Sequence, residues 1–98
     1  MAKGYMIAQI DVHDMESYGE YASKVAATLV PYEGRFLVRG GKTVPLEGDP
    51  PPQRTVVSEF PSLTHARDWY ESDAYQALIP LRQAAGVTRS YLAEGPDD

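Results

Sequence analysis

Residues 5–30 read YMIAQIDVHDMESYGEYASKVAATLV, and the spacing of the apolar residues changes within this stretch. Every second residue near its start is apolar: Met6, Ala8, Ile10 and Val12. This alternation predicts a β-strand over 5–12, because successive side chains of a strand point to opposite faces. After Asp14, a typical helix N-cap residue, apolar side chains recur every three or four positions and predict an amphipathic helix. We expect that helix to end near Val30, since Pro31 disfavours helical geometry in the residue before it.

The rest of the chain continues with strands and helices in an order that indicates the fold. We expect a strand over 35–39, a proline-rich loop over 46–53, a strand over 55–60, helical pieces beginning at Ser62 and at Ser72 or Asp73, and a strand over 87–93. Pro80 has to break or kink the second helical piece. The order β-α-β-β-α-β predicts an α+β, ferredoxin-like fold with a four-stranded antiparallel sheet and both helices on one face. Within this sheet we expect strands 5–12 and 55–60 to form the central pair and to run parallel.

Length and composition limit the kinds of partner. With 98 residues the chain has the size of one domain, which we place at 1–98 with an ordered core of about 4–95. The net charge of −5 disfavours nucleic acid and anionic membrane surfaces, because both need a cationic footprint. No apolar run approaches the length of a membrane helix, so we expect a cytoplasmic protein. The chain has 0 cysteines and no metal-ligand spacing, so we expect neither a metal site nor a cofactor.

The sheet face opposite the helices is expected to carry an apolar patch. The alternation in the strands places these apolar side chains there: Tyr5, Ile7, Leu37, Val57 and Leu92, interleaved with Gln9, Arg39 and Glu59. An exposed patch of this kind indicates a protein partner. We therefore expect a homodimer in which two copies of the chain pack sheet to sheet.

Three segments of the chain resemble a known family. They are GYMIAQIDVHDMESYGEY at 4–21, GRFLVRGG at 34–41 and RTVVSEFPSLTHARDWYESDAYQALIPLRQAA at 54–85. They resemble the bacterial domain-of-unknown-function family numbered 1330, in the dimeric α/β-barrel superfamily of ferredoxin-like proteins. The resemblance extends from Gly4 to Gly95 and departs from the family at Asp73, where members often have proline. It implies two subunits that pair their sheets into a barrel with the helices outside.

Aromatic side chains on the predicted helices are the leading candidates for a ligand site. The chain has 7 tyrosines, and a core of this size rarely needs several, since each buried hydroxyl requires a hydrogen-bond partner. A pocket between helices and sheet that is lined by Tyr21, Phe36, Trp69 and Tyr70 would suit a flat apolar ligand with a few polar atoms. Plain core packing is the alternative interpretation. The resemblance implies the same location, because pockets in the wider superfamily typically lie between sheet and helices.

Three charged or titratable side chains are further candidates. His13, which lies between two aspartates, is a candidate general acid or base, with a turn residue as the alternative. Arg39 is a candidate catalytic residue that orients a carboxylate or enolate, and Gly40-Gly41 beside it forms either an anion-binding turn or a bulge. If Arg39 and Glu59 face the same way on neighbouring strands, they form an ion pair. Fixing the dimer registry is then the favoured role for that pair, and contacting a ligand in a pocket is the other.

Two functional hypotheses remain, and the sequence does not decide whether the protein is an enzyme. The first is a small-molecule-binding dimer, with a cofactor-independent oxygenase- or isomerase-like enzyme for a small aromatic or carboxylate compound as its catalytic form. It rests on the aromatic residues and on the resemblance, since the wider superfamily contains such enzymes. The alternative is a non-catalytic ligand-binding or assembly protein, which the lack of a nucleophile–base pair supports. A cavity with convergent polar groups would favour the first, and a space filled by the protein's own tyrosines the second.

Overall fold

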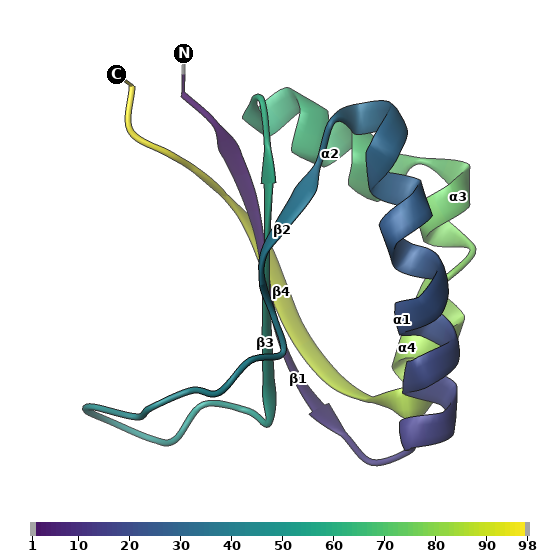
Figure 1. Ribbon diagram of the computed structural model, residues 1–98, viewed down its shortest axis with the longest axis vertical. Helices are drawn as coiled ribbons and strands as arrows, with labels where there is room; N and C mark the ends of the chain where they lie inside the picture. The colour runs from purple at the N-terminus through teal and green to yellow at the C-terminus, as the bar shows by residue number, and fades with distance from the viewer. Residues whose placement is uncertain (1, 98) are drawn as a thin grey trace.

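The computed structural model describes residues 2–97 as one sheet covered by helices (Figure 1). The elements are β1 (Gly4–Val12), α1 (Met15–Leu29), the 3-10 helix η1 (Val30–Tyr32), β2 (Arg35–Arg39), β3 (Arg54–Phe60), α2 (Leu63–Glu71), α3 (Asp73–Gln76), α4 (Ile79–Ala85) and β4 (Gly86–Glu94). This order confirms the predicted α+β, ferredoxin-like fold, with the second helical unit divided into three helices. Within the described part of the chain, no helix is long and apolar enough to span a membrane.

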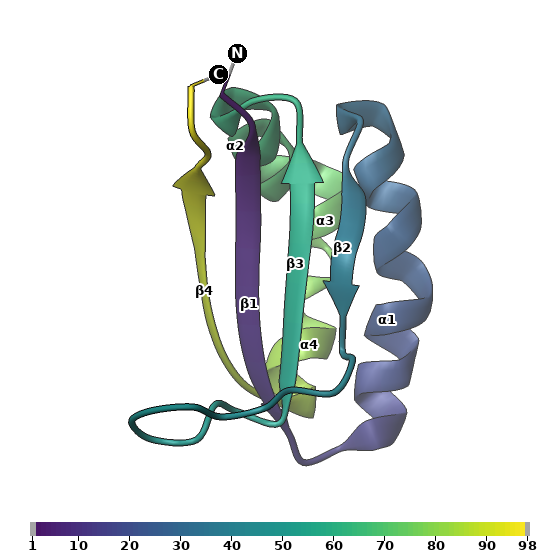
Figure 2. The ribbon, with the colours of Figure 1, turned by 60° about the vertical axis from the view of Figure 1, so that its left-hand side comes forward.

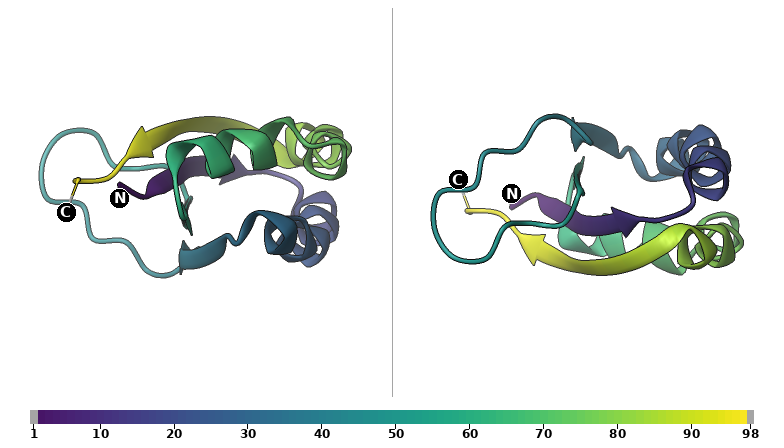
Figure 3. Two further views of the ribbon diagram at one scale, coloured as in Figure 1. Left: turned by 90° about the horizontal axis from the view of Figure 1, so that it is seen from above. Right: turned by 90° about the horizontal axis from the view of Figure 1, so that it is seen from below.

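The four strands lie in the order β2-β3-β1-β4, and every neighbouring pair is antiparallel (Figure 2). The predicted central pair, β1 and β3, is confirmed, but its expected parallel orientation is wrong. The path of the chain explains this. Helix α1 carries the chain back to the starting end of β1, so β2 runs in the same direction as β1. The chain then reverses between β2 and β3, so β3 runs opposite to both β2 and β1. All helices lie on one face of the sheet (Figures 1 and 3). We call the uncovered face the open face.

Side-chain caps and a proline set the ends of the helices. Asp14 accepts a hydrogen bond from the Ser17 backbone N–H at 3.2 Å and starts α1, as predicted. The side chains of Ser62 and Ser72 cap α2 and α3 in the same way. Pro80 lies in the first turn of α4, where no intrahelical hydrogen bond needs its missing N–H. The predicted break of the helix near Pro80 is therefore confirmed: α3 ends at Gln76, and a new helix, α4, begins at Ile79.

The core between helices and sheet is rich in aromatic rings. Trp69 is 0% exposed, and its ring centre lies 5.3 Å from that of Phe60 and 4.2 Å from that of Tyr75. Its indole N–H donates to Thr28 Oγ1 at 2.9 Å, which satisfies the one polar atom of the ring. Trp69 thereby joins α2 to α1 and to the sheet.

A bulge in β2 reverses the expected orientation of Arg39. The residue pairs between β2 and β3 are Arg35 with Glu59, Phe36 with Ser58, Val38 with Val57, and Arg39 with Val56. Leu37 is the extra residue, and it shifts the alternation by one position for the rest of the strand. Arg39 therefore shares the helix-covered face with the buried Val56, and its predicted pairing with Glu59 is wrong.

Glu59 lies on the open face with other partners. Arg35 Nη2 is 2.8 Å from Glu59 Oε1, the Tyr5 hydroxyl donates to Oε2 at 3.1 Å, and Lys3 Nζ lies 3.5 Å from Oε1. These contacts, led by the hydrogen bond from Arg35, hold the pKa of Glu59 below its ordinary value. The carboxylate is thus fixed within the open face, away from the helices.

On β4, the apolar patch of the open face contains a different residue from the one that the strand alternation predicts. The register places Tyr91 opposite Ile7, and Leu92 opposite Met6. Met6 belongs to the core, so Leu92 packs against the core and its predicted position on the open face is wrong. Tyr91, which is 54% exposed, takes that place. The misassignment results from the register, because a shift by one residue moves a side chain to the other face.

The segment between β2 and β3 projects away from the sheet on the side opposite the helices (Figures 1 and 3). Its Val44 and Leu46 are exposed. Gln53 fixes its return to the sheet: the Gln53 backbone N–H donates to Asp11 Oδ1 at 2.9 Å, and its side-chain oxygen accepts from the Val12 N–H at 3.0 Å. The prolines before it cannot donate to a strand ladder, which keeps this segment a loop as predicted.

Candidate functional site

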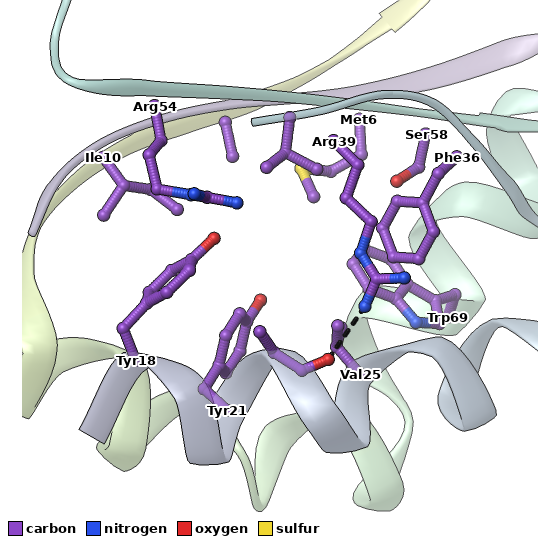
Figure 4. Close-up of a pocket in the computed structure, with 13 residues that line it drawn as sticks. Met6, Ile10, Tyr18, Tyr21, Val25, Phe36, Arg39, Arg54, Ser58 and Trp69 are labelled. Carbon is purple, nitrogen blue, oxygen red and sulfur yellow. Dashed lines mark hydrogen bonds between the residues drawn. The ribbon is translucent and has the colours of Figure 1, made fainter. Parts of the chain in front are cut away.

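A cavity lies between α1 and the helix-covered face of the sheet, and thirteen residues line it (Figure 4). Its volume of about 30 Å³ accommodates one or two water molecules. Most of the wall is apolar or aromatic and includes Tyr18, Tyr21, Phe36 and Trp69. Arg39, Arg54 and Ser58 complete it. An apolar cavity with a few convergent polar groups is the usual form of a small-molecule site.

Two arginine side chains give the cavity a positive charge. Arg39 reaches from the end of β2 to α1, where Nη2 donates to the Ala22 carbonyl at 2.9 Å (Figure 4). Its guanidinium carbon lies 4.2 Å from the centre of the Phe36 ring. The guanidinium carbon of Arg54, the first residue of β3, lies 4.9 Å from the centre of the Tyr18 ring. Both cations therefore lie over aromatic faces, and none of the thirteen lining residues, all within the described range, is acidic.

Two buried polar atoms at the cavity have no protein partner. Ser58 is 0% exposed, and within residues 2–97 neither its hydroxyl oxygen nor Arg54 Nε has a hydrogen-bond partner. A buried polar group left unpaired costs about 1–3 kcal/mol, so nearly all such groups in native proteins are paired with protein, water or ligand. These two atoms therefore mark the point where a polar ligand atom would be stabilised.

Gly40 makes room for Arg54. Its φ of 73° lies in the left-handed region that favours glycine, and a side-chain carbon at this position would collide with the Arg54 guanidinium. The bulge of β2 lies upstream, at Leu37, and not at the glycine pair. The glycine of the Arg39-Gly40 pair therefore helps to position the second arginine of the cavity.

A chain of hydrogen bonds leads from the cavity into the core. The Tyr21 hydroxyl oxygen lies 2.9 Å from that of Tyr75, and Arg82 Nη1 donates to the Tyr75 hydroxyl at 2.7 Å. We call these three residues the hydroxyl chain. Burial, together with the nearby Tyr75, raises the pKa of Tyr21 well above its ordinary value. Tyr21 therefore stays protonated at neutral pH and acts as a hydrogen-bonding group, not as a base.

The structure brings together four of the predicted site residues. The four that line the cavity are Tyr21, Phe36, Arg39 and Trp69. His13 lies exposed in the turn between β1 and α1, where its backbone N–H donates to the Ala85 carbonyl at 2.8 Å. Tyr70 lines a separate groove beside β4, and Glu59 lies on the open face. These three side chains do not reach the cavity.

The sequence analysis did not identify Arg54 and Ser58 as site residues, although the residue pattern of β3 indicates them. Both alternate with Val56 along β3 and so share its buried face. A serine and an arginine on the buried face of a central strand break the apolar pattern, and buried polar residues are the informative exceptions.

Comparison with known proteins identifies the family. The model of the Domain of unknown function family DUF1330 matches residues 3–96. The chain belongs to the DUF1330 family. No curated protein matches the sequence of this DUF1330 chain significantly.

Solved structures similar to this DUF1330 chain share its fold. The RPA0582 protein of unknown function from Rhodopseudomonas palustris is 15% identical, with a TM-score of 0.77 over 99% of this chain and 85% of that one. SnoaB, a cofactor-independent oxygenase from Streptomyces nogalater, is 13% identical, with a TM-score of 0.65 over 100% and 97%. A dimeric ferredoxin-like protein of unknown function from Thermobifida fusca is 11% identical, with a TM-score of 0.62 over 94% and 90%. At such identities the likeness shows the fold alone.

Proposed function

We propose that this DUF1330 protein binds a small aromatic or carboxylate compound in the cavity between α1 and the sheet. The observation that supports this most is the pair of buried atoms without a protein partner, Ser58 Oγ and Arg54 Nε, at an aromatic-lined cavity with two guanidinium groups. The flat body of such a ligand would pack against the aromatic wall. An anionic oxygen on it would accept charge-assisted hydrogen bonds from the arginines, which are among the strongest that proteins form.

Ligand access requires the cavity to open. Its volume of about 30 Å³ is well below the roughly 150 Å³ that holds a benzene-sized molecule. Arg39 is the side chain best placed to move, because it is exposed and a single hydrogen bond, to the Ala22 carbonyl, holds it to α1. Exposed side chains change rotamer in picoseconds to nanoseconds, so this opening is fast. We expect a bound ligand to replace the contact between Arg39 and Ala22.

The catalytic form of this proposal is a cofactor-independent oxygenase- or isomerase-like enzyme. Guanidinium groups in an apolar cavity stabilise an enolate or a similar anion as it develops, because charges interact strongly where water is excluded. SnoaB, a cofactor-independent oxygenase with the same fold, supports this form. None of the thirteen lining residues is a histidine, lysine or carboxylate, so the substrate has to be acidic enough to lose its proton to water and to bind as the anion. The same observation supports the second candidate, a non-catalytic ligand-binding protein.

The ligand-binding unit in this proposal is a homodimer that packs through the open face. Ile7 lies opposite both Val57 and Tyr91 in the sheet, so apolar side chains of three strands adjoin there. Val38 on β2 lies opposite Val57 and is 39% exposed, which extends the patch to the fourth strand. Apolar patches of this kind mark interaction sites. The description of the Thermobifida fusca neighbour as dimeric supports a dimer as well.

A ligand screen by thermal shift tests the proposed function. A library of aromatic and carboxylic acids is expected to contain compounds that raise the melting temperature, since a ligand at 100 times its Kd adds about 2.7 kcal/mol of stability. Arg54→Met should weaken binding of these compounds about tenfold or more, and the exposed Arg67→Met is the matched control that should not. A library without any stabilising compound, or stabilisation that Arg54→Met leaves unchanged, would contradict the proposal. Chromatography with mass spectrometry of the compounds after incubation in air tests for catalysis. An oxygenated or rearranged product indicates an enzyme, and an unchanged compound indicates a non-catalytic binding protein.

A further inference from the structure

The donors and acceptors of the hydroxyl chain favour one direction for its hydrogen bonds. A guanidinium group donates and never accepts, so the Tyr75 oxygen accepts the bond of 2.7 Å from Arg82. Tyr75 is 1% exposed, so its own hydroxyl proton also needs an acceptor inside the protein. The Tyr21 oxygen, at 2.9 Å, is the acceptor that the described residues provide. If Tyr75 donates to Tyr21, the hydroxyl proton left over is that of Tyr21 at the cavity, where water or a ligand can accept it. If Tyr21 donates, the proton left over is that of Tyr75, which does not line the cavity. The first arrangement, from Arg82 through Tyr75 to Tyr21, is therefore favoured.

This direction leaves the hydroxyl proton of Tyr21 for the cavity. In this arrangement the Tyr21 oxygen accepts from Tyr75, so its own proton is not shared back toward the core. Tyr21 lines the cavity, and its hydroxyl points from α1 toward the sheet in the direction of the space between Arg39 and Arg54 (Figure 4). A hydrogen-bond acceptor in that space would receive this proton.

We propose that Tyr21 is the hydrogen-bond donor that selects an anionic oxygen of the ligand, and that Tyr75 and Arg82 are positioning residues that orient its proton. The inference rests on the proposed function and specifies it: the ligand presents a carboxylate or enolate oxygen to Tyr21, not an N–H or O–H donor. A ligand that offers a donor at this point would face the Tyr21 proton and two guanidinium groups, and would leave them unpaired.

The charge of Arg82 strengthens this donor. Arg82 is 7% exposed, and no salt bridge within residues 2–97 neutralises it. Burial acts to lower the pKa of Arg82, but Tyr75 and Tyr21 outweigh burial and raise it, so the guanidinium stays charged. In a chain of hydrogen bonds each bond polarises the next, so the cation makes the Tyr21 proton more positive.

Benzoate and aniline are the probes that test this inference, because they have the same ring and differ in whether an anionic oxygen or an N–H donor reaches Tyr21. Kd values are measured by NMR titration, from backbone amide shifts of Ser58 and Arg39. Wild-type protein is expected to prefer benzoate. Tyr21→Phe should raise the Kd of benzoate about tenfold, the effect of one hydrogen bond to a charged group, and leave that of aniline within about twofold. Tyr75→Phe and Arg82→Met should reduce the preference in the same direction, and Arg82→Lys should restore part of it.

Tyr32→Phe is the matched control, because it removes a tyrosine hydroxyl that does not line the cavity and should leave the preference unchanged. A preference that survives Tyr21→Phe and Tyr75→Phe overturns the inference while the proposed function stands. Failure of both probes to shift the Ser58 and Arg39 amides counts against the proposed function itself.

A second measurement tests the direction of the chain without any ligand. The Tyr75 hydroxyl proton, held against Tyr21, should give a slowly exchanging proton resonance that Tyr75→Phe removes. The Tyr21 hydroxyl proton should exchange faster, because it faces the cavity. A slowly exchanging resonance that disappears in Tyr21→Phe and persists in Tyr75→Phe would reverse the direction and overturn the inference.

Discussion

Replacing Ser58 with alanine is expected to stabilise the free protein and to weaken ligand binding. The hydroxyl is 0% exposed and has no hydrogen-bond partner within residues 2–97. A buried polar group in this state costs about 1–3 kcal/mol, and the substitution removes one oxygen atom, so little new cavity forms. We therefore expect the free energy of unfolding to rise by about 1 kcal/mol. For a domain of this size that corresponds to a melting temperature roughly 4–8 °C higher.

Urea denaturation followed by circular dichroism measures this change. Wild type and variant are compared at one protein concentration, because the stability of a dimer depends on its concentration. Ser90→Ala is the matched control: Ser90 lies opposite Ala8 in the sheet but is exposed, so the change should stay within about 0.5 kcal/mol. In the presence of benzoate the order should reverse, since Ser58→Ala removes a hydrogen bond to the ligand.

One result would refute the reasoning about Ser58. A loss of stability greater than about 0.5 kcal/mol in Ser58→Ala would mean that the hydroxyl forms a favourable hydrogen bond in the free protein. The serine would then be a structural residue, and the main support for a ligand at this cavity would be gone.

Two predictions concern the open face. Glu59→Gln should destabilise the protein at neutral pH. The difference in stability from wild type should shrink as the pH falls below the ordinary glutamate pKa of 4.5, because a carboxylate whose pKa is lowered by folding loses its stabilising contribution when it is protonated. Urea denaturation at pH 7 and pH 3 measures this difference, and a difference that does not depend on pH would contradict the prediction. Ile7→Lys should convert the proposed homodimer to a monomer, since Ile7 lies between Val57 and Tyr91 on the patch. Sedimentation or light scattering at micromolar concentration measures this, circular dichroism should stay unchanged, and an unchanged dimer would place the interface elsewhere.

Much of the fold could be predicted because its elements depend on local spacing. The alternation in 5–12 and the three-to-four spacing after Asp14 each report which side of one element faces the core. The caps at Asp14, Ser62 and Ser72 depend on a side chain and a backbone N–H only three positions away. Such features need no knowledge of the rest of the chain.

The aromatic part of the site was predictable for the same reason, and its polar part was not. Tyr21 and Trp69 lie on the apolar faces of their helices, so spacing alone directs them to the space where the cavity forms. Arg39 reaches the same space only because a bulge at Leu37 turns it over, and the partnerless state of Ser58 depends on which atoms surround it in three dimensions. The link from Arg82 to Tyr21 through Tyr75 joins residues whose positions no local pattern relates.

The amino-acid sequence by itself determined the type and order of the elements, the aromatic character of the core and the membership of the DUF1330 family. Only the tertiary structure decided that Leu92 and Tyr91 exchange faces and that Arg39 turns toward the helices. The physical reason is that side-chain direction in a strand has a period of two, so a register shift or bulge of one residue moves every later side chain of that strand to the opposite face. Spacing along the chain indicates which side chains of a strand share a face. Pairing between distant strands decides whether that face is the helix-covered face or the open face of the sheet.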